Sequence, residues 1–447
     1  MRLIRSASRL QSSCVRAASG TRALSSSSSS SSSSIISPAR RYASSSSDEP
    51  LQKTALYDLH VSHGGKMVPF GGFHMPVQYA SLSVSASHVF TRTHASLFDV
   101  SHMVQRIFSG PGAAAFLQRV TPAGLAALPV NSSTLSALLH PGTGGIVDDT
   151  VITKLADDEF YVVTNAACRA KDDAYFAEQL SAWDGPAVRH EKQDHKGLIA
   201  LQGPLSADIL ASVLAAGPDS PADLTKVFFG TCTTARIALA GGAVSAPVLI
   251  SRGGYTGEDG FEISIPSAEE TVAVTETLLA SAGPERLQLA GLGARDSLRL
   301  EAGMCLYGHD LDDATTPVEG GLSWIIPKDR RGADAGFHGA EVLAKQLVPK
   351  AKGGAGVERR RVGFVVQGAP AREGAEVVSK DGEKIGNITS GCPSPTLGKN
   401  IAMGYIKDGF HKSGTEVDVV VRGRNRKAVV SKMPFVPTKY WKGTAPA

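Results

Sequence analysis

Two adjacent aspartates, Asp148 and Asp149, are the clearest candidates for acid–base chemistry in the sequence. They lie early in a segment predicted as a β-strand, where successive side chains point to opposite faces. Asp149 is then expected on the same face as Val147 and Val151. A carboxylate between two valines loses hydration, which raises its pKa toward values useful for proton transfer at neutral pH. The same pattern also fits a solvated aspartate pair beside a turn, and the spacing alone does not choose between the two.

A glycine-rich segment, SRGGYTGEDGFE, carries the second candidate, Glu262. Four glycines around Tyr255 allow the backbone to approach a ligand closely, or simply to form a tight loop. After them Phe261, Ile263 and Ile265 alternate onto one apolar face, so Glu262 points the opposite way, toward solvent or toward a pocket. In a pocket its carboxylate could accept two parallel N–H donors, as a guanidine-like or aminopyrimidine edge presents them.

Arg295 and Arg299 lie four residues apart on a predicted helix and therefore on one face. Like charges at this spacing destabilise a helix by a few tenths of a kcal/mol unless an anion lies between them. Asp296 could supply a local partner for Arg299, and an anionic ligand such as a carboxylate tail would serve equally.

Several common cofactor signatures do not occur in the sequence. There is no P-loop motif GxxxxGK[ST], and GLGARD at residues 291–296 begins like a dinucleotide fingerprint but ends in aspartate and has no clear strand before it. Six histidines fall between residues 60 and 102, but their spacings do not place two ligands and a carboxylate on one helix face. We expect these histidines at the surface, at helix caps or in the core. An enzyme built on this chain is therefore expected to use neither a metal nor a protein nucleophile.

The elements that must position these residues are predicted over residues 54–345 as one long mixed α and β region. Residues 287–302 are expected to form the helix that carries the two arginines, despite two glycines. Further helices are predicted over residues 112–120 and 167–180, and strands over residues 134–139, 146–155 and 160–164.

A second region is predicted after a flexible linker, KAKGGAG at residues 350–356. Short β-branched runs separated by turns rich in glycine, proline and aspartate follow it, so residues 357–440 are expected to form a small all-β domain. The runs cover residues 362–366, 376–379, 384–389, 416–422 and 427–431.

Residues 1–47 have the composition of a mitochondrial transit peptide, rich in arginine and serine and free of acidic residues. Ten consecutive serines at residues 25–34 cannot bury apolar surface, so this segment is expected to be disordered. Arg40, Arg41 and Tyr42 resemble a matrix-protease site with cleavage after Tyr42. We therefore expect the mitochondrial matrix as the location; an ordinary disordered tail is the other interpretation.

The composition of the remaining chain excludes several function classes. The seven arginines of residues 1–47 exceed the net charge of +4 of the whole chain, so residues 48–447 are mildly acidic, which argues against nucleic acid as a partner. No apolar run approaches the roughly 18 residues of a membrane span. Four cysteines beyond the N-terminal segment are far apart and without a CxxC pair, so we expect free, partly buried thiols at Cys168, Cys232, Cys305 and Cys392.

The order of ten short motifs resembles that of the aminomethyltransferases, or T-proteins, of the mitochondrial glycine cleavage system. The motifs are LYDLH at 56–60, HGGKMV at 63–68, LFDVSHM at 97–103, GGIVDD at 144–149, YVVTN at 161–165, LQGP at 201–204, GYTGEDG at 254–260, ARDSLRLEAG at 294–303, TPVE at 316–319 and KMPFV at 432–436. Each motif is weak alone, but their order from about residue 54 to residue 440 is specific.

The resemblance implies a fold and a reaction. The fold is of the α+β class, with three lobes around a central channel that binds folate. Two of these lobes are interleaved within residues 54–345, and the third is a barrel-like β lobe over residues 357–440. The reaction moves an aminomethyl group from the dihydrolipoyl arm of the H-protein to tetrahydrofolate, which serves as co-substrate. The products are 5,10-methylenetetrahydrofolate, ammonia and the reduced H-protein. The implied partners are the lipoylated H-protein and, with it, the decarboxylase and dihydrolipoyl dehydrogenase components of the glycine cleavage complex. No metal is implied.

The resemblance also implies roles for individual residues. Asp149 matches the key acid, Glu262 would hold the aminopyrimidine edge of the pterin, and Arg295 matches a substrate-binding arginine for either the folate or the lipoyl arm. Arg361 is a candidate for the folate tail and Tyr440 for a C-terminal contact. The positions that match the lining of the folate cavity are Met103, Leu135, Val163, Asn165, Tyr255 and Trp324.

Two other functions are compatible with such a resemblance. A folate-binding scaffold of the same fold that acts in iron–sulfur assembly would carry a KGCxxGQ-type segment, and residues 299–310 hold none. The folate-using half of a dimethylglycine or sarcosine dehydrogenase would need an additional FAD domain of several hundred residues, for which the sequence has no room.

Overall fold

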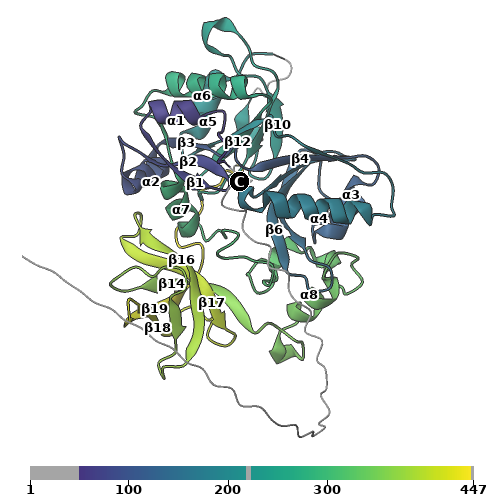
Figure 1. The fold of residues 1–447 in the computed structure, drawn as a ribbon, viewed down its shortest axis with the longest axis vertical. Coiled ribbons are helices and arrows are strands. Elements are labelled where there is room, and N and C mark those ends of the chain that lie inside the picture. The colour runs from purple at the N-terminus through teal and green to yellow at the C-terminus, as the bar shows by residue number, and fades with distance from the viewer. Residues whose placement is uncertain (1–49, 218–222, 444–447) are drawn as a thin grey trace, which may run out of the picture. The chain divides into compact units, whose positions relative to one another are not determined.

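The computed structural model describes residues 50–217 and 223–443, which form a mixture of helices and mostly antiparallel sheets (Figure 1). The transit peptide predicted over residues 1–47 lies outside the described residues. The helices are α1 (Tyr57–Ser62), α2 (Val84–Thr93), α3 (Ala113–Val120), α4 (Arg169–Ser181), α5 (Ser206–Val213), α6 (Ala268–Ala282), α7 (Leu292–Glu301) and α8 (Ala340–Leu347). None of the helices in the described part of the chain is long and apolar enough to cross a bilayer.

The strands confirm the predicted α+β class. They are β1 (Gly65–Phe70), β2 (Phe73–Tyr79), β3 (Ala95–Asp99), β4 (Val104–Ser109), β5 (Ser132–Leu139), β6 (Ile146–Ala156), β7 (Glu159–Thr164), β8 (Arg189–Lys192), β9 (Gly197–Gln202), β10 (Cys232–Ala235), β11 (Val248–Arg252), β12 (Gly260–Ile265), β13 (Leu287–Leu289), β14 (Arg359–Val366), β15 (Glu376–Val378), β16 (Lys384–Ser394), β17 (Lys399–Lys407), β18 (Glu416–Val421) and β19 (Arg424–Ser431).

A five-stranded antiparallel sheet carries the aspartate pair, with its strands in the order β5-β6-β7-β4-β8. Helices α3 and α4 cover one face (Figure 1), where Val162 of β7 packs with Phe176 of α4 in a core closed to solvent. Strand β7 shows the alternation that gives the sheet two apolar faces. Phe160 and Val162 join the core under the helices, while Tyr161 and Val163 join a second core on the opposite face.

A six-stranded sheet carries the glutamate, with its strands in the order β10-β11-β12-β9-β3-β13. Its strands pair antiparallel except for β3 and β13, which run parallel. Phe261, Ile263 and Ile265 share one fully buried face, against Ile209 of α5 and Leu278 of α6. The predicted alternation along β12 is therefore confirmed.

The two sheets pack against each other through the faces that these helices leave open. Tyr161 and Val163 of β7 lie in one buried cluster with Phe98 of β3 and Leu198 of β9. The same alternation sends Glu262 of β12 to this side, between the sheets. The fold therefore brings the aspartate strand and the glutamate strand to one shared interface.

Helix α7 begins at Leu292, so the helix predicted over residues 287–302 is wrong in its first part. Residues 287–289 form β13, which pairs with β3, and GLGARD therefore does follow a strand. A Cβ on Gly293 would lie 2.6 Å from Cγ2 of Val84 in α2, so the absence of a side chain lets the two helices pack closely. A Cβ on Gly291 would lie 2.6 Å from the carbonyl oxygen of Val77 in β2, so the glycines of this motif serve close packing against a strand and a helix.

Strands β14 to β19 close into a six-stranded barrel, in the order β14-β17-β16-β15-β18-β19. The five predicted β runs fall on β14, β15, β16, β18 and β19. Strand β17 has no counterpart among them, because Gly404 interrupts its apolar pattern. A Cβ on Gly404 would lie 2.2 Å from the carbonyl oxygen of Asn387, so this glycine allows β16 to approach closely.

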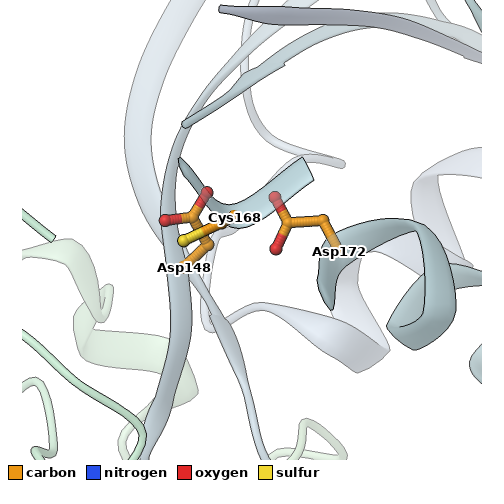
Figure 2. A group of neighbouring side chains, drawn as sticks. All are labelled: Asp148, Cys168 and Asp172. Carbon is orange, nitrogen blue, oxygen red and sulfur yellow. The ribbon is translucent and has the colours of Figure 1, made fainter. Parts of the chain in front are cut away.

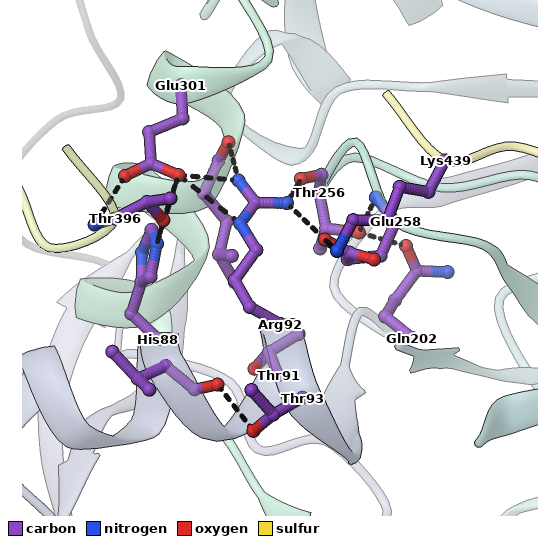
Figure 3. A network of polar contacts seen from close by, with 12 residues as sticks. His88, Thr91, Arg92, Thr93, Gln202, Thr256, Glu258, Glu301, Thr396 and Lys439 are labelled. Carbon is purple, nitrogen blue, oxygen red and sulfur yellow. Dashed lines mark hydrogen bonds and ion pairs between the residues drawn. The ribbon is translucent and has the colours of Figure 1, made fainter. Parts of the chain in front are cut away.

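Buried charged side chains join α2, α7 and the barrel (Figure 3). Arg92 of α2 donates hydrogen bonds to Glu301 of α7 (Nη2–Oε2, 2.8 Å) and to Glu258 (Nη1–Oε1, 3.0 Å). Glu301 also lies 3.1 Å from Nε2 of His88 and accepts the backbone N–H of Thr396, in the barrel turn between β16 and β17, at 3.1 Å. This network fixes the barrel against the helix that carries Arg295 and Arg299.

Candidate functional site

Strand β6 presents its two aspartates to opposite faces of the five-stranded sheet. Asp148 is fully buried on the side of α4, and Asp149 faces the interface between the sheets. The pairing with β5 skips Val147, which packs in the core under the helices with Ile152. The expectation that Asp149 lies between Val147 and Val151 is therefore half wrong, because a bulge turns Val147 to the face of Asp148.

Asn165 links the two aspartates across the sheet. It follows the last residue of β7, and its side-chain Nδ2 donates to Oδ1 of Asp148 and to Oδ1 of Asp149, both at 2.9 Å. Its backbone N–H donates to the second oxygen of Asp148 at 2.8 Å. Asn165 is therefore fixed to Asp148 by both its backbone and its side chain, and its Nδ2 in turn fixes the orientation of the Asp149 carboxyl group.

The Asp149 carboxyl group has a pKa suited to proton transfer. Burial opposes its ionised form, and the neighbouring charge of Asp148 adds to this effect, so together they raise its pKa from 3.8 to about 7. The hydrogen bond from Asn165 acts in the opposite direction but does not outweigh them. The sequence left a solvated aspartate pair open, and the structure excludes it, because Asp148 is fully buried and Asp149 is half-buried between the sheets.

A narrow cleft lies between the two sheets, beside Asp149. Leu135 of β5, Val151 of β6 and Val163 of β7 are paired across neighbouring strands and form an apolar row on one wall. Asp149 lies on the same face of β6 as Val151, two residues along the strand. The cleft is lined by Val151, Thr153, Tyr161, Val163, Leu198, Leu249, Ser251, Glu262 and Ser264.

Glu262 brings a carboxylate to the opposite wall. Burial raises its pKa, and the positive charge of Arg295 partly offsets that rise. Its side chain accepts no hydrogen bond from any described residue, although an ionised carboxylate has about four acceptor positions. Of the two orientations that the sequence left open, solvent or a pocket, the structure has the pocket.

Arg295 and Tyr255 form a cation–π contact near Glu262, with the guanidinium 4.8 Å from the ring centroid. Arg295 donates no side-chain hydrogen bond to the rest of the described chain, and burial lowers its pKa. Tyr255 donates its hydroxyl to the carbonyl oxygen of Cys305. The charges of both Asp149 and Arg295 act on Tyr255, so these groups belong to one site.

Arg299 is neutralised within the protein, unlike Arg295. Its Nε donates to Asp296 at 2.9 Å, which is the local partner that the sequence suggested. Its Nη1 donates to the buried Asp310 at 2.6 Å. The two arginines of α7 therefore differ, because only Arg295 keeps its donors for another group.

Three further candidate residues, Met103, Trp324 and Tyr440, differ in how far they are buried. Met103 packs against the buried cluster that includes Val163. Trp324 lies in a short 3₁₀ turn and is 62% exposed. Tyr440 stacks on Phe229, with ring centroids 4.0 Å apart, beside the glycine-rich loop. No contact in the described residues joins Trp324 or Tyr440 to Asp149.

Arg361 of β14 is held by main-chain carbonyl groups. Its Nε donates to the carbonyl oxygen of Gly320 at 2.7 Å, and its Nη1 donates to that of Gly303 at 3.1 Å. Its Nη2 has no hydrogen-bond partner among the described residues, so one edge of the guanidinium remains available to an anion.

Sequence reasoning missed residues that line the cleft or lie behind it. Leu249 of β11 lines the cleft, while Val248 and Ile250 pack in the core under α5 and α6, so strand alternation could have identified it. Cys168 and Asp172 lie buried behind Asp148, and no local pattern indicates this because they come from a turn and a helix.

A larger cavity of about 480 Å³ adjoins the cleft and shares Tyr161, Leu249 and Ser264 with it. Its remaining lining includes Glu159 and Lys196. None of the residues that the sequence analysis assigned to the site lines this cavity, whereas Val163 and Glu262 line the cleft.

Two family models cover most of the chain. Residues 56–330 match the GCVT N-terminal domain, and residues 359–437 match the glycine cleavage T-protein C-terminal barrel domain. The second match coincides with the closed barrel, and the first contains both facing sheets.

Relatives and a solved structure agree with the family models. The chain is 49% identical over 392 residues to the probable mitochondrial aminomethyltransferase of Schizosaccharomyces pombe, covering 88% of this chain and 95% of that protein. It is 47% identical over 398 residues to the mitochondrial aminomethyltransferase of Mesembryanthemum crystallinum, covering 89% and 92%. The crystal structure of glycine cleavage system aminomethyltransferase T from Bartonella henselae matches with a TM-score of 0.77 and 36% identity, over 87% of this chain and 99% of that one. The chain therefore belongs to the glycine cleavage T-protein family, and it is an aminomethyltransferase of the glycine cleavage system.

Proposed function

We propose that this aminomethyltransferase transfers the one-carbon unit of an aminomethyl-dihydrolipoyl H-protein to tetrahydrofolate. The carbon of S–CH₂–NH₃⁺ loses its bonds to sulfur and to nitrogen and gains bonds to two folate nitrogens. The two N–H protons of the folate leave with the thiol and with ammonium. The products are 5,10-methylenetetrahydrofolate, ammonium and dihydrolipoyl H-protein, so atoms and charge balance without an oxidant.

The observation that carries this proposal is the pairing of two carboxyl groups with different environments at one cleft. Asp149 has a pKa of about 7, while Glu262 has no hydrogen-bond donor from the described chain and faces Arg295. An aminopyrimidine edge offers the parallel N–H donors that the Glu262 carboxylate lacks. A reduced pterin would therefore supply donors to the Glu262 carboxylate and bring its reacting nitrogens beside Asp149.

Asp149 is assigned the proton chemistry. Its carboxylate would accept a proton from a folate nitrogen and stabilise the positive charge that develops as ammonia leaves. Asn165 would keep the carboxylate in place through its hydrogen bond at 2.9 Å. The folate supplies the nucleophile, so the protein contributes mainly by placing two reactants together away from water.

The remaining candidate residues are assigned to binding. Met103, Leu135, Val163, Tyr255 and Trp324 would contact the folate rings. Arg361, whose Nη2 is without a partner in the described chain, would bind the carboxylate tail, and Tyr440 would add a contact near the C-terminus. Arg295 would bind either the folate or the lipoyl arm. The proposed binding requires no metal.

The proposal extends to partners, location and domain limits. Membership of the glycine cleavage system supports the lipoylated H-protein as the donor, together with the decarboxylase and dihydrolipoyl dehydrogenase components. The mitochondrial relatives and the arginine-rich composition of residues 1–47 support import into the matrix. We propose that residues 1–47 are a transit peptide, that residues 54–345 form the folate-binding region as two interleaved lobes, and that residues 357–440 form a separate C-terminal β domain.

Turnover with purified components tests the proposal. The protein is mixed with aminomethyl-loaded H-protein and tetrahydrofolate, and both methylenetetrahydrofolate and ammonia are measured. We expect the two products in equal amounts and only when all three components are present. Ammonia released at the same rate without folate would contradict the proposal.

Glu262→Ala is expected to weaken tetrahydrofolate binding about tenfold or more, since hydrogen bonds to a charged group are worth about 1.5–3 kcal/mol. Isothermal titration calorimetry measures the change. Glu276→Ala, which removes an exposed glutamate from α6, is the matched control and should leave the Kd as it is. An unchanged Kd in Glu262→Ala would reassign this residue.

A further inference from the structure

A second cluster of titratable groups lies on the opposite face of β6 from the cleft (Figure 2). It consists of Asp148 from β6, Cys168 from the turn before α4, and Asp172 from α4, all buried. One oxygen or sulfur atom of each lies within 4.8 Å of the others. Two carboxyl groups this close inside a protein cannot both be ionised at low cost, so the cluster must hold at least one proton.

The hydrogen bonds distinguish the two aspartates. Asp148 accepts two hydrogen bonds from Asn165, at 2.8 and 2.9 Å, and the Cys168 thiol donates a further one. Neither oxygen of Asp172 lies within 3.5 Å of a hydrogen-bond donor among the described residues, and the Thr164 hydroxyl is the one nearby group whose hydrogen bonding lowers its pKa. Asp148 is therefore surrounded by donors, as an anion requires, and Asp172 is not.

We propose that Asp172 carries a proton and donates it in a hydrogen bond to Asp148, which stays ionised and thereby holds Asn165 against Asp149. A carboxylate offers about four acceptor positions, and Asn165 (twice), Cys168 and Asp172 fill them. Asp172 is then a positioning residue, which acts on Asp149 through Asp148 and Asn165. This part rests on the proposed role of Asp149.

The charges around Asp172 agree with a neutral side chain. Burial raises its pKa well above the ordinary value of 3.8, and the charge of Asp148 raises it further. Arg106 is the nearby cation, but its Nη1 donates to Asp173 at 2.7 Å and no nitrogen of it forms a hydrogen bond to Asp172. The charged or titratable groups that act on Asp172 or on its two partners are Asp148, Asp149, Cys168, Arg106, Lys171, Tyr175 and Tyr307.

The pH dependence of stability tests this assignment without any substrate. A carboxyl group that is protonated when folded and ionised when unfolded makes folding less favourable as pH rises above its ordinary value of 3.8. Asp172→Asn removes this penalty and keeps an N–H donor for Asp148. We therefore expect Asp172→Asn to melt at a higher temperature than the wild type at about pH 8, with the difference disappearing near pH 4.

The neighbouring residue Asp173 provides a control, because its replacement should change the melting temperature in the opposite direction. Asp173 is partly exposed and accepts hydrogen bonds from Arg106 and Lys192, at 2.7 and 2.8 Å. Burial acts to raise its pKa, but these contacts outweigh burial and lower it. Asp173→Asn should therefore melt at a lower temperature at neutral pH. If Asp172→Asn is also destabilised there, Asp172 is ionised and paired with Arg106, and the proposal is wrong.

Two further measurements examine the proton and its effect. The infrared C=O stretch of a protonated carboxylic acid should be present in the wild type at about pH 8, where Asp149 is mostly ionised, and lost in Asp172→Asn.

The variant Asp172→Val removes the hydrogen-bond donor to Asp148. Asp148 then takes up the proton itself and no longer repels the charge of Asp149. The midpoint of the pH–rate profile should then fall below that of the wild type, whereas Asp172→Asn should keep it. An unchanged midpoint in Asp172→Val would contradict the positioning role.

Discussion

Asp149→Asn is expected to slow aminomethyl transfer by about a hundredfold or more, the range for loss of a general acid or base. Asparagine keeps the shape and can still hydrogen-bond to Asn165, but it cannot accept a proton from the folate or stabilise positive charge as ammonia leaves. The Kd for tetrahydrofolate should change little, because Glu262 and the apolar walls remain. Single-turnover kinetics with saturating folate measure the effect on the chemical step directly.

The pH dependence of the same reaction gives an independent readout. The reactive form of Asp149 is the carboxylate, so the wild-type rate should fall as pH decreases through about 7, and Asp149→Asn should be slow and free of this dependence. Asp157→Asn, in the turn after β6, changes an exposed aspartate and should behave as wild type. Near wild-type turnover in Asp149→Asn would remove this residue from the chemistry.

Glu301→Ala is expected to lower the free energy of unfolding by about 3–5 kcal/mol, because it breaks a buried ion pair and leaves Glu258 as the only carboxylate paired with Arg92 in the described chain. Arg92 is only 8% exposed and donates two hydrogen bonds to Glu301, at 2.8 and 3.2 Å (Figure 3). The barrel turn would also lose an acceptor for the backbone N–H of Thr396. Urea unfolding at neutral pH measures the loss.

The same glutamate predicts acid sensitivity. Burial alone would raise the pKa of Glu301, but hydrogen bonds from His88 and Ser394 outweigh it and lower the pKa to about 2. The stabilisation is therefore present above the ordinary value of 4.5 and is lost as pH falls toward 2. Glu373→Ala is the control, since Glu373 pairs with His309 at the surface, where such pairs contribute about 0–1 kcal/mol. Equal losses in the two variants would show that the buried network adds nothing.

Strand periodicity predicted the faces of the site strands well. Phe261, Ile263 and Ile265 share a buried face as expected, and Glu262 consequently faces the cleft. Alternation also separates Asp148 from Asp149. It failed at Val147, because a bulge changes the pairing with β5 and a bulge leaves no mark in an alternating apolar pattern.

Long-range packing decided the features that sequence patterns missed. Gly293 and Gly404 lower the helix and strand propensities of their segments, yet both are needed where another element approaches too closely for a Cβ. The partners of Arg299 show the same limit. Asp296 lies one helical turn away and could be predicted, whereas Asp310 comes from the loop that follows α7.

The pKa of Asp149 is also a property of the folded chain. The sequence supplied an acid with an acidic neighbour, but burial makes the largest contribution to its raised pKa. That burial comes from packing two sheets whose strands lie far apart in the sequence. The proton assigned to Asp172 depends likewise on α4 covering the face of the sheet behind Asp148.

The central claim is that one reduced folate binds in the cleft between the two sheets, with its reacting nitrogens beside Asp149. A crystal structure of the protein with a bound reduced folate tests it most directly. We predict the aminopyrimidine edge on Glu262, the pterin against Val151 and Val163, and a folate nitrogen within hydrogen-bonding distance of the Asp149 carboxylate. A folate bound elsewhere, or bound in the cleft with Asp149 out of contact, would contradict the account.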